Sequence, residues 1–209
     1  MEKVFITGAT GYLGRPLVEQ LLARGHGVRA LVRPGQSIKS EAVVGDALNS
    51  STFSGSVRGC STLVHLVGTP KPAPWKARQF EEVDRRSLEA SLAAALEAKV
   101  RHLIFLSVAQ PAPVMRAYIA VRKQCEERIR AAAIPATFLR PFYVLGEGHW
   151  WPLALVPFYK LAEAIPSCRE PAMRLGLVRR RQMVNALVWA VENPAEGVRI
   201  MDVGRIREF

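Results

Sequence analysis

A glycine-rich loop near the start of the chain has residue types and spacing suited to binding a diphosphate. It follows a short apolar run and reads Thr7-Gly8-Ala9-Thr10-Gly11-Tyr12-Leu13-Gly14. Gly8 permits a sharp turn, Gly11 lets the backbone approach a pyrophosphate, and Gly14 lets a helix pack close to the strand. The unpaired amides at the helix start carry partial positive charge. We therefore expect the whole loop to bind a dinucleotide; a glycine turn without a ligand is the alternative.

Arg33 lies where a site of this kind distinguishes between the two nicotinamide cofactors. At the end of the second strand an acidic residue usually accepts hydrogen bonds from the adenosine ribose, and it repels a 2′-phosphate. Here Arg33 follows Gly14 by 19 residues, and a guanidinium pairs well with a phosphate. We expect NADP(H) to be favoured over NAD(H). The alternative is that Arg33 is a solvated loop charge.

The elements that must position these residues alternate between short strands and longer helices. Strands are expected at residues 3–7, 28–32, 42–45, 62–67, 102–107, 136–139 and 198–203, and helices at 12–24, 80–99, 115–133 and 179–192, with a short helix within 52–58. The strands are β-branched or aliphatic runs, and the helices carry apolar residues at a spacing of three to four. This alternation predicts an α/β fold with a Rossmann-type, doubly wound parallel sheet.

Length and composition favour one folded domain. The chain has 209 residues, of which 49% are hydrophobic and 22% are charged, so it has too much apolar content for disorder and too little length for two ordinary domains. We expect a single NAD(P)-binding domain over residues 1–209. About residues 142–178 and 193–209 are expected to form a small C-terminal elaboration on the substrate side.

Charge, cysteine content and hydropathy limit the partners. The net charge of +11, from 29 Lys and Arg against 18 Asp and Glu, favours anionic ligands without naming one. No nucleic-acid partner is expected, since no aromatic set accompanies the basic residues. The three cysteines have no metal-ligand spacing, so we expect reduced thiols and no metal. With no signal peptide or membrane span expected, the cytoplasm is the predicted compartment.

Several short motifs together resemble the atypical short-chain dehydrogenase/reductase superfamily, in particular its NAD(P)H-binding and NmrA-like members. Besides the glycine loop they are Gly45-Asp46, His65-Leu66-Val67-Gly68 and Leu139-Arg140-Pro141, and the resemblance covers about residues 3–146. It implies that Asp46 and Ala47 edge the adenine. It also implies that Leu66, Val67 and Gly68 line the adenosine ribose and phosphate, and that Pro141, Phe142 and Tyr143 approach the nicotinamide. A turn or helix cap is the alternative role for Asp46.

The same resemblance implies a catalytic set of Ser107, after the fifth strand, and Tyr118, on the next helix. The superfamily's Tyr-x-x-x-Lys pattern has Arg122 in the lysine position here, with Lys123 next to it. Four residues along a helix span about 400°, so Arg122 and not Lys123 is the neighbour of Tyr118. Arginine stabilises a phenolate but does not relay a proton. Tyr118 is expected to donate a proton and Ser107 to orient the acceptor; simple packing of Tyr118 on the sheet is the alternative.

An aromatic segment follows the expected nicotinamide contact. Residues 142–151 include two tryptophans and His149. The tryptophans offer flat surfaces for a planar acceptor, and His149 is either an auxiliary acid or a solvated loop residue. Trp150–Tyr159 is a pocket wall, part of the core, or a patch that docks on a membrane or a partner.

These observations predict an NADP(H)-dependent oxidoreductase acting on a small carbonyl, quinone or enone. Arg122 in place of lysine favours an alternative, a catalytically silent NADP(H)-binding sensor of the NmrA-like kind. An accessory protein that holds the nucleotide and docks on a partner or membrane complex is a third possibility. The sequence does not identify the acceptor or the oligomeric state.

Overall fold

The computed structural model describes residues 2–112, 114–146 and 175–209. Its main element is a seven-stranded sheet in the order β3-β2-β1-β4-β5-β6-β9, in which every neighbouring pair is parallel. The strands are β1 (Lys3–Thr7), β2 (Gly27–Val32), β3 (Glu41–Val44), β4 (Thr62–His65), β5 (His102–Leu106), β6 (Ala136–Leu139) and β9 (Val198–Met201). A second, two-stranded parallel sheet pairs β7 (Tyr143–Leu145) with β8 (Leu177–Arg179).

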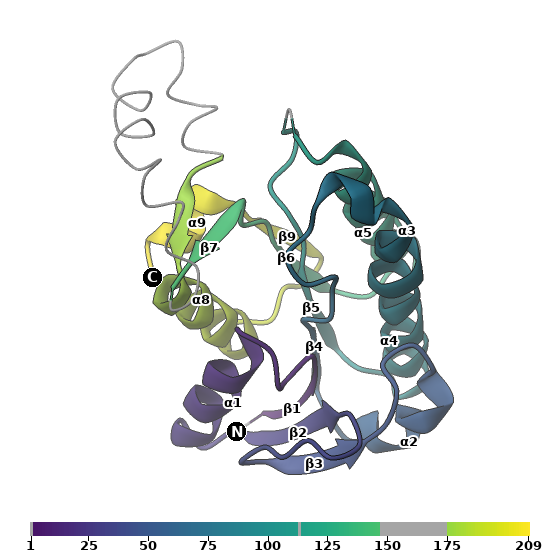
Figure 1. The fold of residues 1–209 in the computed structure, drawn as a ribbon. Helices are drawn as coiled ribbons and strands as arrows, with labels where there is room; N and C mark the ends of the chain where they lie inside the picture. Colours follow the sequence, from purple (N-terminus) through teal and green to yellow (C-terminus); the bar gives the residue numbers. More distant parts are fainter. Residues whose placement is uncertain (1, 113, 147–174) are drawn as a thin grey trace.

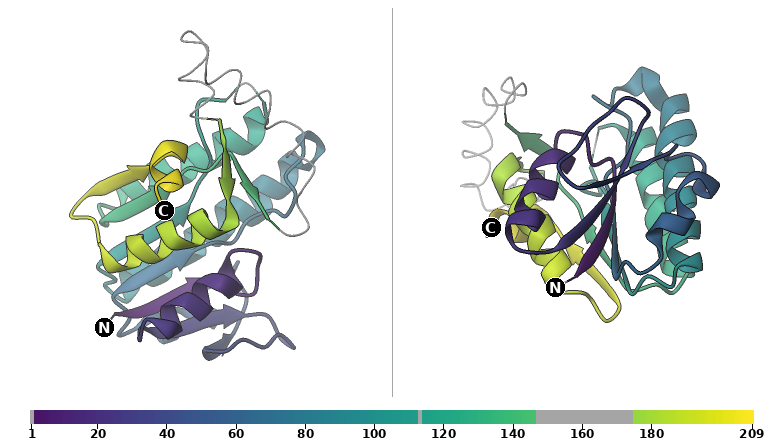
Figure 2. Two further views of the ribbon diagram at one scale, coloured as in Figure 1. Left: turned by 90° about the vertical axis from the view of Figure 1, so that its left-hand side faces the viewer. Right: turned by 90° about the horizontal axis from the view of Figure 1, so that it is seen from below.

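Helices cover both faces of the sheet (Figures 1 and 2). The α-helices are α1 (Gly14–Ala23), α2 (Ser54–Val57), α3 (Ala77–Gln79), α4 (Arg86–Glu97), α5 (Arg116–Ala131), α8 (Arg180–Glu192) and α9 (Val203–Arg207). The 3₁₀ turns are η1 (Ser50–Thr52) and η2 (Pro74–Lys76), and η3 (Phe80–Arg85) is a π-helix. Figure 1 shows α1 and α8 on one side of the sheet and α4 and α5 on the other. The predicted α/β fold, a Rossmann-type doubly wound sheet, is confirmed.

Two hydrophobic cores follow from the alternation of side chains along each strand. In β1, Val4 and Ile6 point into the core shared with α1 and α8, whereas Phe5 points into the core shared with α4 and α5. Successive residues of a strand face opposite sides of the sheet, so one apolar strand supplies both cores. This is why the central strands are continuous apolar runs.

Strand order reverses between β1 and β4, because β2 and β3 extend the sheet on one side of β1 and the later strands extend it on the other. Ligands of open parallel sheets bind outside the carboxyl ends of the strands at such a reversal. The loops that follow β1, β2, β4, β5 and β6 all leave from this edge. They carry most of the residues singled out above.

Several expected boundaries were wrong, for local reasons. The helix expected from residue 12 begins at Gly14, and the helix expected over 80–99 starts as the π-helix η3 and becomes α-helical at Arg86. No strand was expected within residues 142–178, but Tyr143–Leu145 forms the strand β7, which pairs with β8. Arg179 ends β8 instead of opening a helix.

The C-terminal segments are partly described. β9 adds a strand to the main sheet beside β6, and α9 follows it directly. Assignment of residues 142–178 and 193–209 to the substrate side stays a prediction. Among the described residues, no helix combines the length and hydropathy that a bilayer crossing requires.

Candidate functional site

The loop between β1 and α1 is packed too closely for side chains at its glycines. Gly8 has φ +75°, and a Cβ there would lie 2.9 Å from the carbonyl carbon of Leu66. A Cβ at Gly14 would overlap the carbonyl oxygen of Gly8, and one at Gly11 would lie 3.1 Å from the same oxygen. In the first turn of α1, Pro16 has no N–H, and the amides of Arg15 and Leu17 donate to the carbonyls of Gly11 and Leu13, each at 3.2 Å. The positive end of the helix dipole still faces the glycine loop. The result is a backbone-lined surface suited to a diphosphate, so the loop fits the expected cofactor.

The side chains of this loop lie in different surroundings. Leu13 is buried in the core with α1 and α8, so a contact between Leu13 and a ligand would involve its backbone. Thr10 is half-buried on the loop. The Tyr12 ring lies under the guanidinium of Arg180, 5.1 Å from its centroid, and a Cβ at Gly146 would overlap the Tyr12 hydroxyl. Tyr12 thus joins the glycine loop to the segment after β7.

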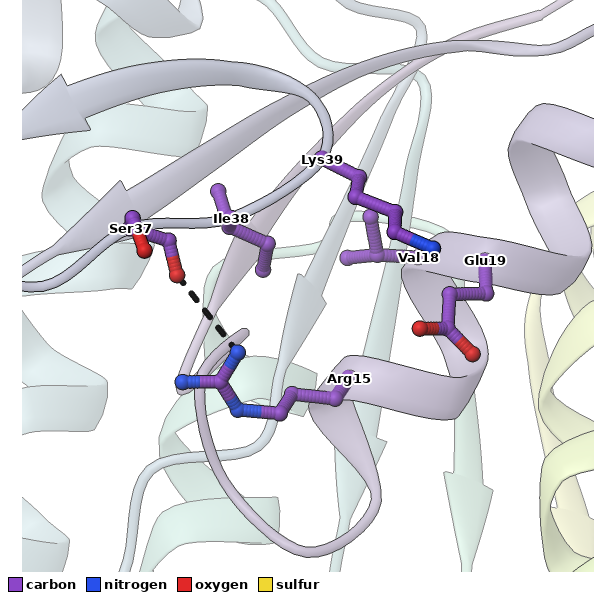
Figure 3. A pocket seen from close by; sticks show the side chains of 6 residues that line it. All are labelled: Arg15, Val18, Glu19, Ser37, Ile38 and Lys39. Carbon is purple, nitrogen blue, oxygen red and sulfur yellow. Dashed lines mark hydrogen bonds between the residues drawn. The ribbon is translucent and has the colours of Figure 1, made fainter.

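A pocket of about 320 Å³ lies between α1 and the loop that follows β2 (Figure 3). Its lining residues are Arg15, Val18, Glu19, Ser37, Ile38 and Lys39. The Arg15 guanidinium donates to the Ser37 carbonyl at 3.5 Å. Arg33 is exposed at the start of this loop, directly after β2. The edge beyond β2 therefore carries Arg15, Arg33 and Lys39, all cations, with one acid, Glu19, among them.

Asp46 has the geometry of a turn residue. Its Oδ1 accepts a hydrogen bond from the Leu48 amide at 2.9 Å, and its own amide donates to the Thr52 hydroxyl at 3.0 Å. These contacts match the turn alternative. Asp46 is exposed and Ala47 is half-buried after β3, and their contact with an adenine stays a prediction.

The end of β4 lies next to the glycine loop. The Leu66 amide donates to the Thr7 carbonyl at 3.1 Å and holds this end of β4 against β1. Leu66, Val67 and Gly68 are each partly exposed. A Cβ at Gly68 would overlap the Arg122 guanidinium. Position 68 must therefore be a glycine to leave room for the Arg122 side chain from α5, in addition to any role beside a ligand.

Arg122 is held in a buried ion pair. The side chains of Arg122 and Asp84 are 4% and 0% exposed, and the two charged groups lie 2.6 Å apart. Arg122 also donates to the Leu106 carbonyl at 2.9 Å. The other Asp84 oxygen accepts from the amide and the hydroxyl of Thr69, at 3.0 and 2.6 Å. Asp84 lies on η3, and its carboxylate is satisfied by Arg122 from α5 and by Thr69 from the loop after β4.

Tyr118 lies between Phe80 and Arg122. The two aromatic rings are 5.0 Å apart, and the Arg122 guanidinium is 5.2 Å from the Tyr118 centroid. Burial raises the pKa of the Tyr118 phenol, the positive charge of Arg122 lowers it, and Asp84 raises it. The net effect is a raised pKa, so the phenol keeps its proton at neutral pH. The predicted proximity of Tyr118 and Arg122 is present.

Ser107 belongs to a second buried cluster. Its hydroxyl donates to Glu126 at 2.6 Å, and Glu126 also accepts from Gln110 at 2.9 Å and from Arg140 at 2.9 and 2.5 Å. Glu126 is 2% exposed. Because the Ser107 proton is engaged by a carboxylate, the hydroxyl can form a further hydrogen bond in this arrangement only as an acceptor. The structure does not bring Ser107 and Tyr118 into a hydrogen bond with each other.

The segment expected beside the nicotinamide leaves β6 at the same edge. The Pro141 carbonyl accepts from the Ala109 amide at 2.9 Å, which ties the ends of β5 and β6 together. Phe142 packs against the core with α1 and α8, and Tyr143 opens β7. His149 and Trp150–Tyr159 lie outside the described residues.

Three charged residues of the site were not expected: Asp84, Glu126 and Arg140. Glu126 follows Arg122 by four residues and Tyr118 by eight, so helical periodicity places the three on one face of α5. That signal was available in the sequence. Asp84 was not recognisable in the same way, because the π-turn changes which side of the helix it faces.

The parallel order of strands, the reversal at β1 and β4 and the glycine cradle define a dinucleotide-binding α/β fold. A family model described as NAD(P)H-binding matches residues 8–148. The chain therefore belongs to the NAD(P)H-binding family.

Relatives of known activity match part of their own length. The chain is 28% identical to the ceramide reductase of Caulobacter vibrioides over 209 aligned positions, covering 97% of this chain and 65% of that protein. It is 30% identical to the dihydroflavonol 4-reductase of Dianthus caryophyllus over 122 positions, 51% of this chain and 34% of that protein. The chain thus spans about two thirds of one relative and one third of the other.

Solved structures share the fold. MoeE5 in complex with UDP-glucuronic acid and NAD superposes with a TM-score of 0.74 at 22% identity, covering 97% of this chain and 76% of that one. The uronate dehydrogenase of Agrobacterium tumefaciens superposes with a TM-score of 0.70 at 17% identity, covering 96% and 76%. At such identities the likeness concerns the fold alone.

Proposed function

We propose that the protein is an NADP(H)-dependent oxidoreductase that reduces a small carbonyl, quinone or enone. The observation that carries the proposal is the contact between Tyr118 and the Arg122 guanidinium, at the same carboxyl edge of the sheet that carries the glycine cradle. The relatives named as reductases support the same reaction class. The bound cofactor supplies the hydride.

The residues of the chain have distinct parts in this proposal. The glycine loop holds the diphosphate through its backbone, and Pro141, Phe142 and Tyr143 border the nicotinamide side. Tyr118 donates a proton to the acceptor oxygen, and its raised pKa keeps that proton available at neutral pH. Arg122 stabilises the phenolate that remains, without accepting the proton itself. Ser107 offers its oxygen to a donor on the ligand.

The test of this chemistry is Tyr118→Phe. We expect it to lower kcat for NADPH oxidation at least about 100-fold, because general acid catalysis contributes factors of that size, while NADPH affinity stays within a factor of two or so. Lys123→Met is the control, since Lys123 is exposed on the same helix and pairs with Glu127. Steady-state rates against a panel of quinones, flavins and aldehydes provide the measurement. Equal rates for Tyr118→Phe and wild type would exclude Tyr118 as the acid.

A second candidate function is a catalytically silent NADP(H)-binding sensor. The ion pair of Arg122 with Asp84 and the hydrogen bond from Ser107 to Glu126 favour it, because both groups already have partners within the protein. Micromolar NADPH binding by calorimetry, together with no turnover of any acceptor, would support the sensor over the enzyme.

The preference for NADP(H) is supported by the cations beyond β2. We expect Arg33→Ser to weaken NADPH binding about tenfold, the loss of one charge-assisted contact to a phosphate, and to leave NADH binding unchanged. Arg58→Ser is the control, because Arg58 is also exposed and pairs with Glu97 away from this loop. Calorimetric titration with both dinucleotides measures the effect. Stronger binding of NADH than of NADPH by the wild type would contradict the assignment.

A further inference from the structure

The loop that follows β4 exposes a tryptophan. Trp75, in η2, is 83% exposed, the largest exposed fraction among the large hydrophobic side chains that the structure describes. Exposure of an indole leaves its apolar surface in water, while its N–H suits a position between an apolar phase and a polar one. The cofactor site described above does not explain this exposure.

Cations flank Trp75 without matching acids. Residues 71–79 contain Lys71, Lys76 and Arg78 and no Asp or Glu. Arg78 pairs with Glu82 at 2.6 Å, but no carboxylate of the described chain lies within ion-pair distance of Lys71 or Lys76. The Lys76 ammonium donates to the Pro70 carbonyl at 2.7 Å, which orders the loop and leaves the charge in place.

A second loop at the same end of the sheet also exposes an apolar side chain and a cation. Val114 is 49% exposed after β5, and Arg116 is exposed at the start of α5. The ring contact between Phe80 and Tyr118 joins the bases of the two loops. Figure 1 shows both loops at the same end of the sheet. We call Lys71, Trp75, Lys76, Val114 and Arg116 the basic tryptophan patch.

We propose that the basic tryptophan patch docks on an anionic lipid surface. Tryptophan partitions to the headgroup region of a bilayer, and lysines near the surface are attracted to anionic headgroups. The apolar part of the patch is two side chains, far less than the area of a stable protein interface. A lipid surface requires no shape complementarity, so charge and one indole suffice for reversible binding. Docking brings the carboxyl edge of the sheet, with its site, toward the bilayer.

Co-sedimentation with vesicles tests the proposal. The full chain is mixed with phosphatidylcholine vesicles, with or without about one third phosphatidylglycerol, at low salt and at high salt. We expect binding to the anionic vesicles that falls as salt rises. Trp75→Ser removes the indole that partitions to the headgroup region, and the double variant Lys71→Glu, Lys76→Glu removes the attraction to anionic headgroups. Each should lower the partition coefficient at least about tenfold. Circular dichroism verifies that the variants fold.

Matched controls separate the patch from general charge and hydrophobicity. Val44→Ser changes an exposed apolar residue on the edge strand β3, and Lys99→Glu reverses an exposed charge at the amino end of β5. Both should bind anionic vesicles nearly as wild type does. Wild type remaining in the supernatant, or controls losing as much binding as the patch variants, would overturn the proposal. Dimerisation that Trp75→Ser abolishes, without vesicle binding, would overturn it in favour of a second copy of the chain.

Discussion

The two halves of the carboxyl edge are built in opposite ways. Beside β1 and β2 the site consists of backbone, because the missing side chains of three glycines create the cradle. The cations Arg15 and Lys39 line the pocket next to it. Beside β4, β5 and β6 it consists of side chains, with the ion pair Asp84–Arg122 buried and the ion pair Glu126–Arg140 partly buried. The geometry of the first half depends on space left by missing side chains, and that of the second half depends on charge compensation. Buried ion pairs contribute little net stability but are costly to break, so they hold geometry.

Breaking the charge compensation should have the largest effect. Asp84→Asn leaves the buried Arg122 guanidinium without its carboxylate, and we expect the free energy of unfolding to fall by about 3–5 kcal/mol. Glu82→Gln removes the exposed partner of Arg78 instead, where the side chains are 48% and 90% exposed, and should cost less than about 1 kcal/mol. Urea denaturation measures both. Equal losses would show that burial does not distinguish the two pairs.

Filling the space beside β1 should have the next largest effect. Gly14→Ala places a Cβ against the Gly8 carbonyl, and such overpacking costs about 1–3 kcal/mol. We expect NADPH affinity to fall together with stability, because the cradle must shift. Gly27→Ala is the control, since its Cβ would meet Lys3 Cγ at an ordinary 3.5 Å. Calorimetry that finds the same NADPH affinity in both variants would contradict a tight cradle.

His65, at the end of β4, connects the two halves. Its Nδ1 lies 2.9 Å from both the Thr7 hydroxyl on β1 and the Ser91 hydroxyl on α4. Burial, and then the charge of Arg122, lowers the pKa of His65 from 6.5 to about 3. The unfolded chain binds this proton below pH 6.5 and the folded chain does not, so stability is lost as pH falls from 6.5 toward 3. The loss from His65 should be on the order of 2 kcal/mol between pH 7 and pH 4.5.

Urea midpoints at the two pH values measure this loss. His65→Asn removes the titration and should reduce the difference between pH 7 and pH 4.5. His102 remains in that variant as a second buried histidine, with a pKa lowered by burial, and by the charge of Arg199, to about 4. Part of the acid sensitivity should therefore persist. A variant as acid-sensitive as wild type would show that His65 is not responsible.

The sequence predicted more of the half beside β1 and β2 than of the half beside β4, β5 and β6. The glycine loop, Arg33 and the strand that precedes each of them form one local pattern, and the structure has the expected elements there. The helical spacing also predicted that Tyr118 and Arg122 are neighbours. The engagement of Ser107 by Glu126 was not predicted, because Glu126 lies 19 residues further along the chain. Local spacing carries no information on such a contact.

By itself, the sequence determined the alternation of strands and helices and the position of the glycine cradle, since both follow from side-chain periodicity and from the absence of Cβ atoms over a few residues. The tertiary structure alone decided where the charges are neutralised. Asp84 reaches Arg122 across 38 residues of chain, through a π-turn and a glycine at position 68 that leaves room for the guanidinium. The physical reason is that a buried charge requires a partner in space, and the fold brings that partner from distant parts of the sequence.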